Sequence, residues 1–392
     1  MMKSTPVVGM QPELLKWARE SIGKSPSDVA YALRRPVEEV ESWERGDKAP
    51  TYVQLEKLAY EIYKRPIAVF FLPIPPLESN PQSDFRTLPE DDLRELLPDT
   101  YLHIRRARAY QFALRELLEG VSPNPIPMWH SVTLSEDLSV VQQAVQVRDC
   151  LGITLDEQTR CTDDEQALKQ WRSSVERMGI FVFKNTFEQK SISGFCLSDD
   201  QFPVIYLNNS TTKTRQIFSL FHELTHLLLR MNGISKVEDT YIIGLPQREQ
   251  KVERFCNALA AEILIPISDF RQQTHQISGN IENATETVFE NLAARYSVSR
   301  EAILRRFLDQ KEVGTGFYER KAKEWASQQK QKTKGGNHYT TLNTYLSNKF
   351  SKEVFSRYHR QQITKYEASD YLGIKPKQFD YLERIKLRGI EA

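Results

Sequence analysis

Hydrophobic side chains in the first quarter of the chain recur at the three- and four-residue spacing that places them on one face of an α-helix. This spacing predicts four short helices separated by tight turns, at residues 13–22, 26–33, 37–45 and 51–63. Ser25-Pro26-Ser27-Asp28 is a helix-capping signal with proline in the first turn, and Gly46 ends the third helix. Two short helices joined by a tight turn, inside a four-helix cluster, indicate a helix-turn-helix domain.

The rest of the chain changes from a helical to a strand-like pattern and back. After a proline-rich boundary at 72–81, we expect connector helices at 90–119 (interrupted near Pro98), 135–150 and 162–178. Short apolar runs predict three strands, at 180–183, 193–197 and 204–207. Helical spacing then resumes at 214–230, 249–264, 288–306 and 321–334, and in four helices between 338 and 385. We therefore expect an α+β chain that is mostly helical.

Length, net charge and cysteine content restrict the number of domains, the binding partners and the cellular compartment that can be expected. At 392 residues the chain is longer than one ordinary core, so several domains are expected. The net charge of +1 does not mark a nucleic-acid or membrane binder, and any such site must be a local patch. No apolar run approaches the length of a membrane span. The four cysteines are widely spaced and are interpreted as reduced, buried thiols of a cytoplasmic protein: Cys150, Cys161, Cys196 and Cys256.

The predicted helix-turn-helix domain carries unusual charges for a DNA reader. The sequence Ser-Trp-Glu-Arg-Gly at 42–46, followed by Ala-Pro-Thr at 49–51, resembles the Xre family of phage-repressor-like DNA-binding domains. The expected recognition helix, however, holds four glutamates, which repel phosphate. The candidate contacts to double-stranded DNA are Arg34, Arg35, Arg45 and Lys48. The alternative is that this domain keeps its fold for protein contacts or homodimerisation.

The strongest chemical signal lies in the helix expected at 214–230, which contains the HExxH pattern of zinc metallopeptidases. His222 and His226 are four residues apart and therefore share one helix face, where their ring nitrogens can bind one metal ion. Glu223 follows the first histidine directly and can take a proton from the attacking water. The alternative, two surface histidines on an ordinary helix, is disfavoured by the apolar residues around them.

A catalytic zinc ion usually takes three protein ligands, and the next helix offers a third. Glu253 lies 27 residues after His226 and shares a face with Asn257, on a helix side that is otherwise apolar. A buried carboxylate needs a partner, and a metal ion supplies one. We prefer Glu253 over the competing Glu249 and Glu262. The candidate hydrogen-bond donors for stabilising the oxyanion of the reaction are Tyr241 and His275.

The two helices together resemble a known family. FHELTHLLL at 221–229 and ERFCNALAAEILIP at 253–266 are similar to the ImmA/IrrE family of bacterial metallopeptidases, with Cys256 and Leu259 where alanine and phenylalanine are more usual. The resemblance implies His222, His226 and Glu253 as ligands of a zinc ion and Glu223 as catalytic base. It also implies cleavage of a regulatory protein, typically a transcriptional repressor.

Helical segments after the peptidase motifs extend this picture. Residues 288–306 form a second helix-turn-helix-like unit, from which Arg300, Arg305 and Arg306 are expected to project, and a helical buttress is the alternative. The segment at 364–374 again has the residue pattern of a helix-turn-helix motif. Longer family members that fuse an Xre domain to the peptidase are similar to this arrangement.

The predicted fold is a multidomain α+β chain, mostly helical, with a helix-turn-helix bundle, a zincin-like metallopeptidase domain containing a small sheet, and helical C-terminal modules. The expected divisions are a helix-turn-helix domain at 1–75, a connector at 76–160, the peptidase domain at 161–275, a helical extension at 276–334 and a C-terminal module at 335–392.

The leading hypothesis is a cytoplasmic regulatory zinc endopeptidase joined to a DNA- or partner-binding domain, with a protein substrate and no membrane. One alternative is a transcription regulator or antitoxin of a toxin–antitoxin pair that keeps the metal site without proteolysis. A second is a purely structural metal site, and the intact Glu223 argues against it.

Overall fold

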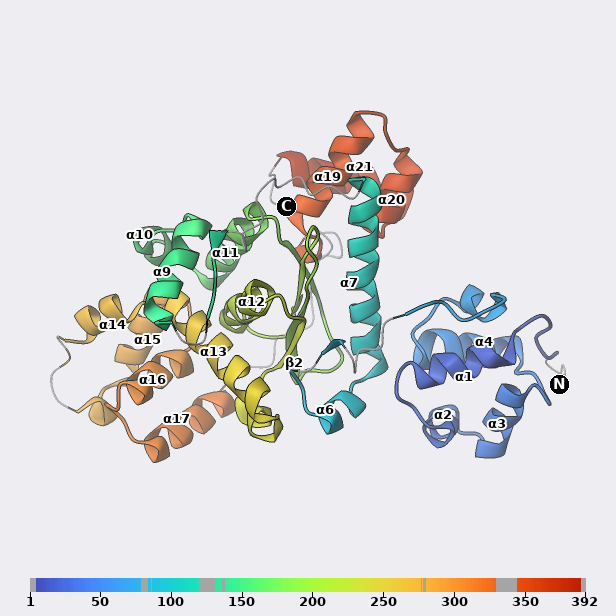
Figure 1. The fold of residues 1–392 in the computed structure, drawn as a ribbon, viewed down its shortest axis with the longest axis horizontal. Coiled ribbons are helices and arrows are strands. Elements are labelled where there is room, and N and C mark those ends of the chain that lie inside the picture. Colours follow the sequence, from blue (N-terminus) through green and yellow to red (C-terminus); the bar gives the residue numbers. More distant parts are fainter. Residues whose placement is uncertain are drawn as a thin grey trace. The chain divides into compact units, whose positions relative to one another are not determined.

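The computed structural model describes residues 5–78, 84–85, 87–119, 131–135, 138–275, 277, 280–328 and 344–388. The chain forms two compact units. The first comprises residues 1–106 with 187–189, and the second comprises 107–186 and 190–392. The α+β, mostly helical fold class predicted from sequence is confirmed (Figure 1).

The first unit is built from short helices whose ends follow local signals. In order they are α1 (Pro12–Glu20), α2 (Pro26–Leu33), α3 (Val37–Arg45), α4 (Tyr52–Lys57), the π-helical turn η1 (Leu58–Ile62), the 3₁₀ turn η2 (Ile67–Phe71), α6 (Glu90–Arg94) and the start of α7 (Pro98–Leu117). The side chain of Ser25 accepts from the backbone N–H of Asp28, while the Asp28 carboxylate accepts from Ser25, so the predicted capping box is present. The break predicted near Pro98 separates α6 from α7.

The four candidate DNA contacts lie around α3. Arg34 ends α2 in the left-handed conformation, Arg35 lies 3.9 Å from Glu39, and Arg45 pairs with both Glu41 and Asp47. Lys48 is exposed beyond the end of α3. Glutamates therefore neutralise two of the four cations locally, and DNA binding by these residues stays a prediction.

The second unit is organised around a four-stranded sheet, with strand order β1-β3-β2-β4. The strands are β1 (Phe181–Asn185), β2 (Ile192–Leu197), β3 (Val204–Asn208) and β4 (Gly233–Lys236). β1 and β3 are parallel, whereas β2 pairs antiparallel with both β3 and β4. The first three strands confirm the sequence expectation within one or two residues. β4 was not predicted, and it forms the edge of the sheet.

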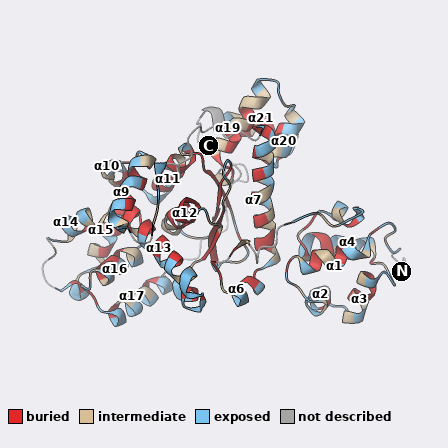
Figure 2. Ribbon diagram, in the orientation of Figure 1, coloured by how far each residue is buried: buried red, intermediate tan, exposed pale blue. Residues whose placement is uncertain are grey.

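Each face of this sheet packs against helices. On one face, Val182, Cys196 and Ile205 join the main hydrophobic core around the central helix α12 (Lys213–Leu228). On the other face, Phe183 stacks on Tyr110 of α7 with ring centroids 4.0 Å apart, and Phe350 meets both rings edge-on. Figure 2 shows α12 and the strands as the most continuously buried part of this unit. The candidate site on α12 therefore lies in the buried centre of the second unit.

Further helices complete the second unit. They are α9 (Val140–Leu151), α10 (Leu155–Thr159), α11 (Asp164–Arg177), the 3₁₀ turn η3 (Asp239–Gly244), α13 (Gln247–Leu264), α14 (Ile267–Thr274), the 3₁₀ turn η4 (Ile281–Asn283), α15 (Glu286–Tyr296), α16 (Arg300–Asp309), α17 (Thr315–Gln328), α19 (Asn348–His359), α20 (Lys365–Leu372) and α21 (Pro376–Arg388). Parts of the helices expected at 321–334 and 340–349 lie outside the described residues.

One prediction about this unit is wrong. Arg306 does not project from α16, because it is only 8% exposed and its Nη2 lies 2.5 Å from Glu262 Oε2. Arg306 also donates to the carbonyl of Ile265. The sequence pattern of α16 could not show this, since the partner comes from the distant helix α13.

Candidate metal centre

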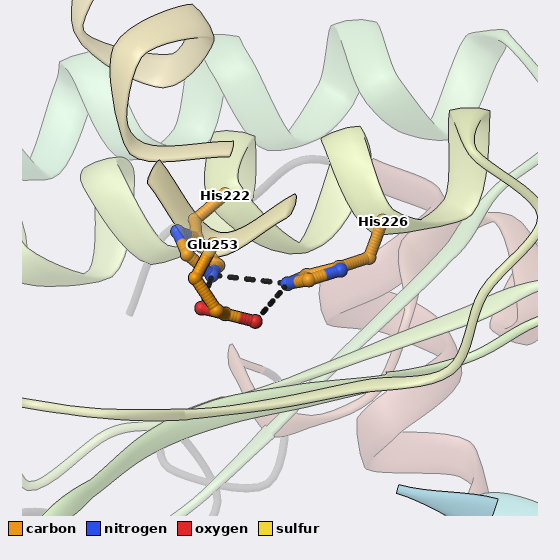
Figure 3. A group of neighbouring side chains, drawn as sticks. All are labelled: His222, His226 and Glu253. Carbon is orange, nitrogen blue, oxygen red and sulfur yellow. Dashed lines mark hydrogen bonds and ion pairs between the residues drawn. The ribbon is translucent and has the colours of Figure 1, made fainter. Parts of the chain in front are cut away.

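The helix α12 holds two imidazoles on one side of the sheet. Thr212 caps its N-terminus by accepting from the backbone N–H of Arg215, and the residues from Gln216 onward are nearly all buried. His222 and His226 are 3% and 0% exposed, respectively. Their four-residue spacing turns both rings toward α13, as predicted from sequence (Figure 3).

The structure brings Glu253 of α13 to these two rings. The Nε2 atoms of His222 and His226 are 3.1 Å apart. Glu253 Oε2 lies 3.2 Å from His222 Nε2, and Oε1 lies 3.2 Å from His226 Nε2 (Figure 3). The ligand atoms of this trio all lie within 4.8 Å of one another, so the three side chains form a buried group that can hold a metal ion.

Burial and opposite charges compete at this group. Burial lowers the pKa of His222 and His226, but the hydrogen bonds and negative charge of Glu253 outweigh it, so both pKa values lie above the ordinary histidine value. For Glu253, burial raises the pKa, while the two imidazoles lower it further and leave it well below its usual range. Glu253 is therefore ionised, and a carboxylate with no water around it favours a cation beside it.

An amide from the next helical turn orients the first imidazole. His222 Nδ1 lies 2.8 Å from Asn257 Oδ1, and Asn257 Nδ2 donates to Asp239 Oδ2 over 3.2 Å. Because the amide nitrogen is used by Asp239, the amide oxygen faces the ring and His222 Nδ1 must donate its proton. When His222 is neutral, its lone pair therefore resides on Nε2, the ring atom nearest Glu253, as a metal ligand requires.

Of the two residues expected to stabilise an oxyanion, Tyr241 lies beside the group formed by His222, His226 and Glu253. Its hydroxyl donates to Glu253 Oε2 over 2.7 Å, and burial together with this carboxylate raises its pKa well above the ordinary tyrosine value. Tyr241 is therefore a neutral donor that fixes the carboxylate. His275, in contrast, is exposed at the end of α14.

Glu223, the predicted base, is fully buried beside the trio. Its Oε1 accepts a short hydrogen bond from Ser235 Oγ of β4. Its Oε2 is buried and has no hydrogen-bond partner among the residues that the structure describes. The neighbouring Cys196 thiol stays protonated, because burial and the charge of Glu223 raise its pKa. One carboxylate oxygen is thus held, while the other has unused capacity to accept a proton.

The close approach of β4 depends on a glycine. A Cβ atom at Gly233 would lie 2.6 Å from Cδ2 of His226 and 3.0 Å from Oε2 of Glu223. Only a residue without a side chain allows the strand to pass at this distance. The sequence analysis ended the helix at residue 230 and missed both this role and Ser235, because a four-residue strand is too short to show an alternating pattern.

The competing carboxylates have other surroundings. Glu262 pairs with Arg306, and its Oε1 accepts from the backbone N–H of Ile267. Glu249 is half-buried in the first turn of α13. Neither belongs to the group of ligand atoms found in the described part of the chain. The geometry thus favours Glu253, the preferred third ligand.

Comparison with known proteins agrees with this geometry. Residues 175–308 match the model of the IrrE N-terminal-like domain, peptidase family M78. This segment is therefore similar to a metallopeptidase domain, and the family implies a metal ion and a protein substrate. The match contains all four residues of the centre and continues through α15 and α16. No curated protein matches the chain.

Among the described residues, no helix combines the length and the apolar character needed to cross a bilayer. All four cysteines are free. Cys196 and Cys256 are buried as predicted, whereas the prediction of burial is wrong for Cys150 and Cys161, which are half-buried.

Proposed function

We propose that the chain is a regulatory zinc endopeptidase in which His222, His226 and Glu253 hold the metal ion and Glu223 is the catalytic base. The observation that carries the proposal is the convergence of two Nε2 atoms and an ionised carboxylate in a buried group, with a second carboxylate adjacent. A structural site would need no such second carboxylate. Zinc bound there would supply Lewis acidity toward a peptide carbonyl and the attacking water.

The donor set fits a zinc ion. Two imidazole nitrogens and one carboxylate form a known catalytic combination and leave a position for a substrate. The buried Oε1 atom of Glu253 faces His226 Nε2 at 3.2 Å, and Asn257 directs the lone pair of a neutral His222 inward. Each of these features is satisfied by a cation among the three side chains.

Glu223 performs the proton transfer in this proposal. Ser235 holds Oε1, so Oε2 accepts the proton released by the attacking water and then delivers it to the leaving amine. Burial of Glu223 excludes bulk water, which would otherwise solvate the carboxylate. Because residue 233 is a glycine, β4 can pack closely against both Glu223 Oε2 and the His226 ring.

The edge strand β4 is suited to hold an extended peptide. Its outer side is not paired with another strand of the sheet, and Ser235 links it directly to Glu223. A peptide added along this edge gains backbone hydrogen bonds and brings its scissile bond close to the base. This arrangement supports an endopeptidase that selects an exposed, extended segment of its protein substrate.

The substrate class follows from the helical modules joined to the peptidase. We propose a repressor or another regulatory protein, which the helix-turn-helix regions bring close through DNA or through direct protein contacts. Selection by a separate module suits cleavage of one regulatory target. A toxin–antitoxin partner is the corresponding target if the chain is encoded beside a toxin.

The test compares the wild type with Glu223→Gln and with Glu249→Gln as a matched control, each expressed in cells together with the products of neighbouring genes. We expect about one equivalent of zinc in all three proteins, and loss of a specific cleaved product only in Glu223→Gln. Zinc in the wild type without any cleavage difference would refute proteolysis and favour a regulator with a retained metal site. Wild-type protein that binds no zinc would refute the metal assignment itself.

A further inference from the structure

Among the described residues, three pairs of helices in which both helices have at least eight residues share one turn. In each pair the first helix ends at a residue in the left-handed conformation, and the second helix begins three residues later. The left-handed residues are Arg34 between α2 and α3, Ser297 between α15 and α16, and Gly373 between α20 and α21, with φ angles of 56°, 54° and 65°. A three-residue turn of this kind joins the two helices of a helix-turn-helix motif.

The buried positions of the three pairs also coincide. Counted from the left-handed residue, they stand five and four residues before it and six and nine residues after it. They are Val29, Ala30, Val40 and Trp43 in the first pair, Leu292, Ala293, Ile303 and Arg306 in the second, and Ala368, Ser369, Phe379 and Leu382 in the third. The same positions face inward each time, so the second helix of each pair presents an equivalent outer face.

The outer faces differ in charge. Four residues after the turn residue, the exposed side chains are Glu38, Glu301 and Lys377 in the three pairs. This position lies near the start of the second helix, where a helix-turn-helix protein reaches the major groove. A carboxylate is repelled there by phosphate, whereas an ammonium group is attracted. Only in the third pair is the side chain at this position positively charged and therefore attracted to DNA.

Ion pairs reinforce this distinction. The cations of α16 are occupied: Arg300 pairs with Glu286, Arg305 with Asp309, and Arg306 with Glu262. On the third pair, Lys365 pairs with Asp380. Lys375 and Lys377 are exposed, and neither forms an ion pair within the described residues.

Charge in the sequence is concentrated at the same place. Residues 344–388 contain ten Lys and Arg against five Asp and Glu, a net charge of +5, although the whole chain has only +1. A basic segment on a chain of balanced charge is a sequence feature of nucleic-acid-binding regions.

The third pair is held so that this surface stays outward. Arg172 of α11 donates to the carbonyls of Thr344 and Leu346, each over 2.6 Å, and anchors the segment before α19. Phe350 of α19 packs on Phe183 of the sheet. The inner contacts are therefore made through α19 and through Tyr371 of α20, which interacts with Glu116 of α7, whereas Tyr366 of α20 is 72% exposed.

We propose that the pair α20–α21 is a double-stranded DNA-binding surface, with α21 in the major groove. Lys377 is placed toward the base edges, and Lys375 and Arg384 are placed toward the phosphates. The proposal does not depend on proteolysis, and it places the DNA contact on the unit that carries the metal centre. DNA-bound proteins would then be brought to the peptidase at a high local concentration.

The experiment measures binding of the full chain to a labelled, mixed-sequence 30-base-pair DNA duplex by fluorescence anisotropy at two salt concentrations. The wild type is expected to bind in the roughly micromolar range at low salt and to weaken steeply at higher salt. The variant K375E/K377E/R384E is expected to bind at least about tenfold more weakly, with a shallower salt dependence. The matched control R94E/R320E/K323E, which reverses three exposed cations on α6 and α17, is expected to retain binding. The variant R34E/R35E/K48E tests the first pair as the alternative DNA contact.

Circular dichroism melting of each variant ensures that folding is intact, and single variants K377E and K377Q replace the triple variant if it unfolds. Absence of wild-type binding would overturn the proposal. Loss of binding in R34E/R35E/K48E, with K377E and the C-terminal variant unaffected, would assign the DNA contact to the first pair instead. Equal affinity for a single-stranded RNA of the same length would exclude duplex recognition by α21.

Discussion

The most direct test of the metal centre is to add one methyl group at Gly233. The new Cβ of Gly233→Ala would lie 2.6 Å from His226 Cδ2 and 2.7 Å from Cγ, whereas non-bonded carbon atoms favour about 3.5–4.0 Å. Either the His226 ring or β4 must therefore move by about 1 Å. Overpacking of this kind costs about 1–3 kcal/mol of folding stability.

The effect on metal binding is expected to be larger than the effect on folding. Metal–ligand distances tolerate only about 0.2 Å of change, so a ring displaced by about 1 Å no longer binds in the same geometry. Disturbing the support of a metal ligand typically lowers affinity about 10–100-fold, and we expect Gly233→Ala to reach at least this range. Competition with a zinc chelator measures the affinity, and urea unfolding of the metal-free protein measures stability.

Gly316 provides a matched control, because nothing lies within 4 Å of a Cβ atom built there. Gly316→Ala lies in the first turn of α17 and is expected to be neutral or stabilising by up to about 1 kcal/mol, with unchanged zinc affinity. If Gly233→Ala bound zinc as tightly as Gly316→Ala and unfolded at the same urea concentration, the close packing of β4 on His226 would be refuted.

Three further predictions follow from buried polar groups. Asn257→Ala removes the acceptor of His222 and should weaken zinc binding about 10–100-fold, while Asn257→Asp keeps an acceptor and should lose less; equal chelator-competition curves for the two would contradict this role. Burial lowers the pKa of Lys184 to about 6, below its unfolded value of 10.5, so the unfolded chain binds more protons between these values and stability from this group rises with pH. Lys184→Met should therefore stabilise the fold by roughly 2–3 kcal/mol more at pH 7 than at pH 9 in urea titrations, and a pH-independent gain would show that Lys184 is charged when folded. Arg306→Met leaves Glu262 buried without its partner and should cost about 3–5 kcal/mol in the same assay, whereas the double variant with Glu262→Met should recover much of the loss; additive losses would argue against a buried pair.

Local signals in the sequence account for most of the helix boundaries. The capping box at Ser25, the left-handed glycine after α3 and the break before Pro98 each act within a few residues of the backbone they stop. Such signals can be recognised in a sequence because both partners of the interaction lie close together in it. Elements whose partners are distant could not be predicted in this way.

The missing strand illustrates this limit. β4 consists of four residues, and it is a strand because β2 pairs with it and α12 lies beneath it. Its sequence carries no alternation long enough to distinguish it from the end of a helix. The roles of Ser235 and Gly233 in positioning Glu223 and His226 could therefore not be predicted from the sequence, although both residues belong to the candidate metal centre.

For the chemistry of this protein, the sequence alone determined the candidate site residues and their helical spacing: two histidines four residues apart, the adjacent Glu223, and a polar Glu253 on an apolar helix face. This spacing can be recognised in a short stretch of sequence, because residues four apart lie on the same face of a helix. The tertiary structure decided which carboxylate joins the histidines, which hydrogen bonds orient them, and which arginines are buried in ion pairs. These outcomes depend on contacts between helices and strands far apart in the chain, and the charges on one helix do not reveal which partner another helix will supply.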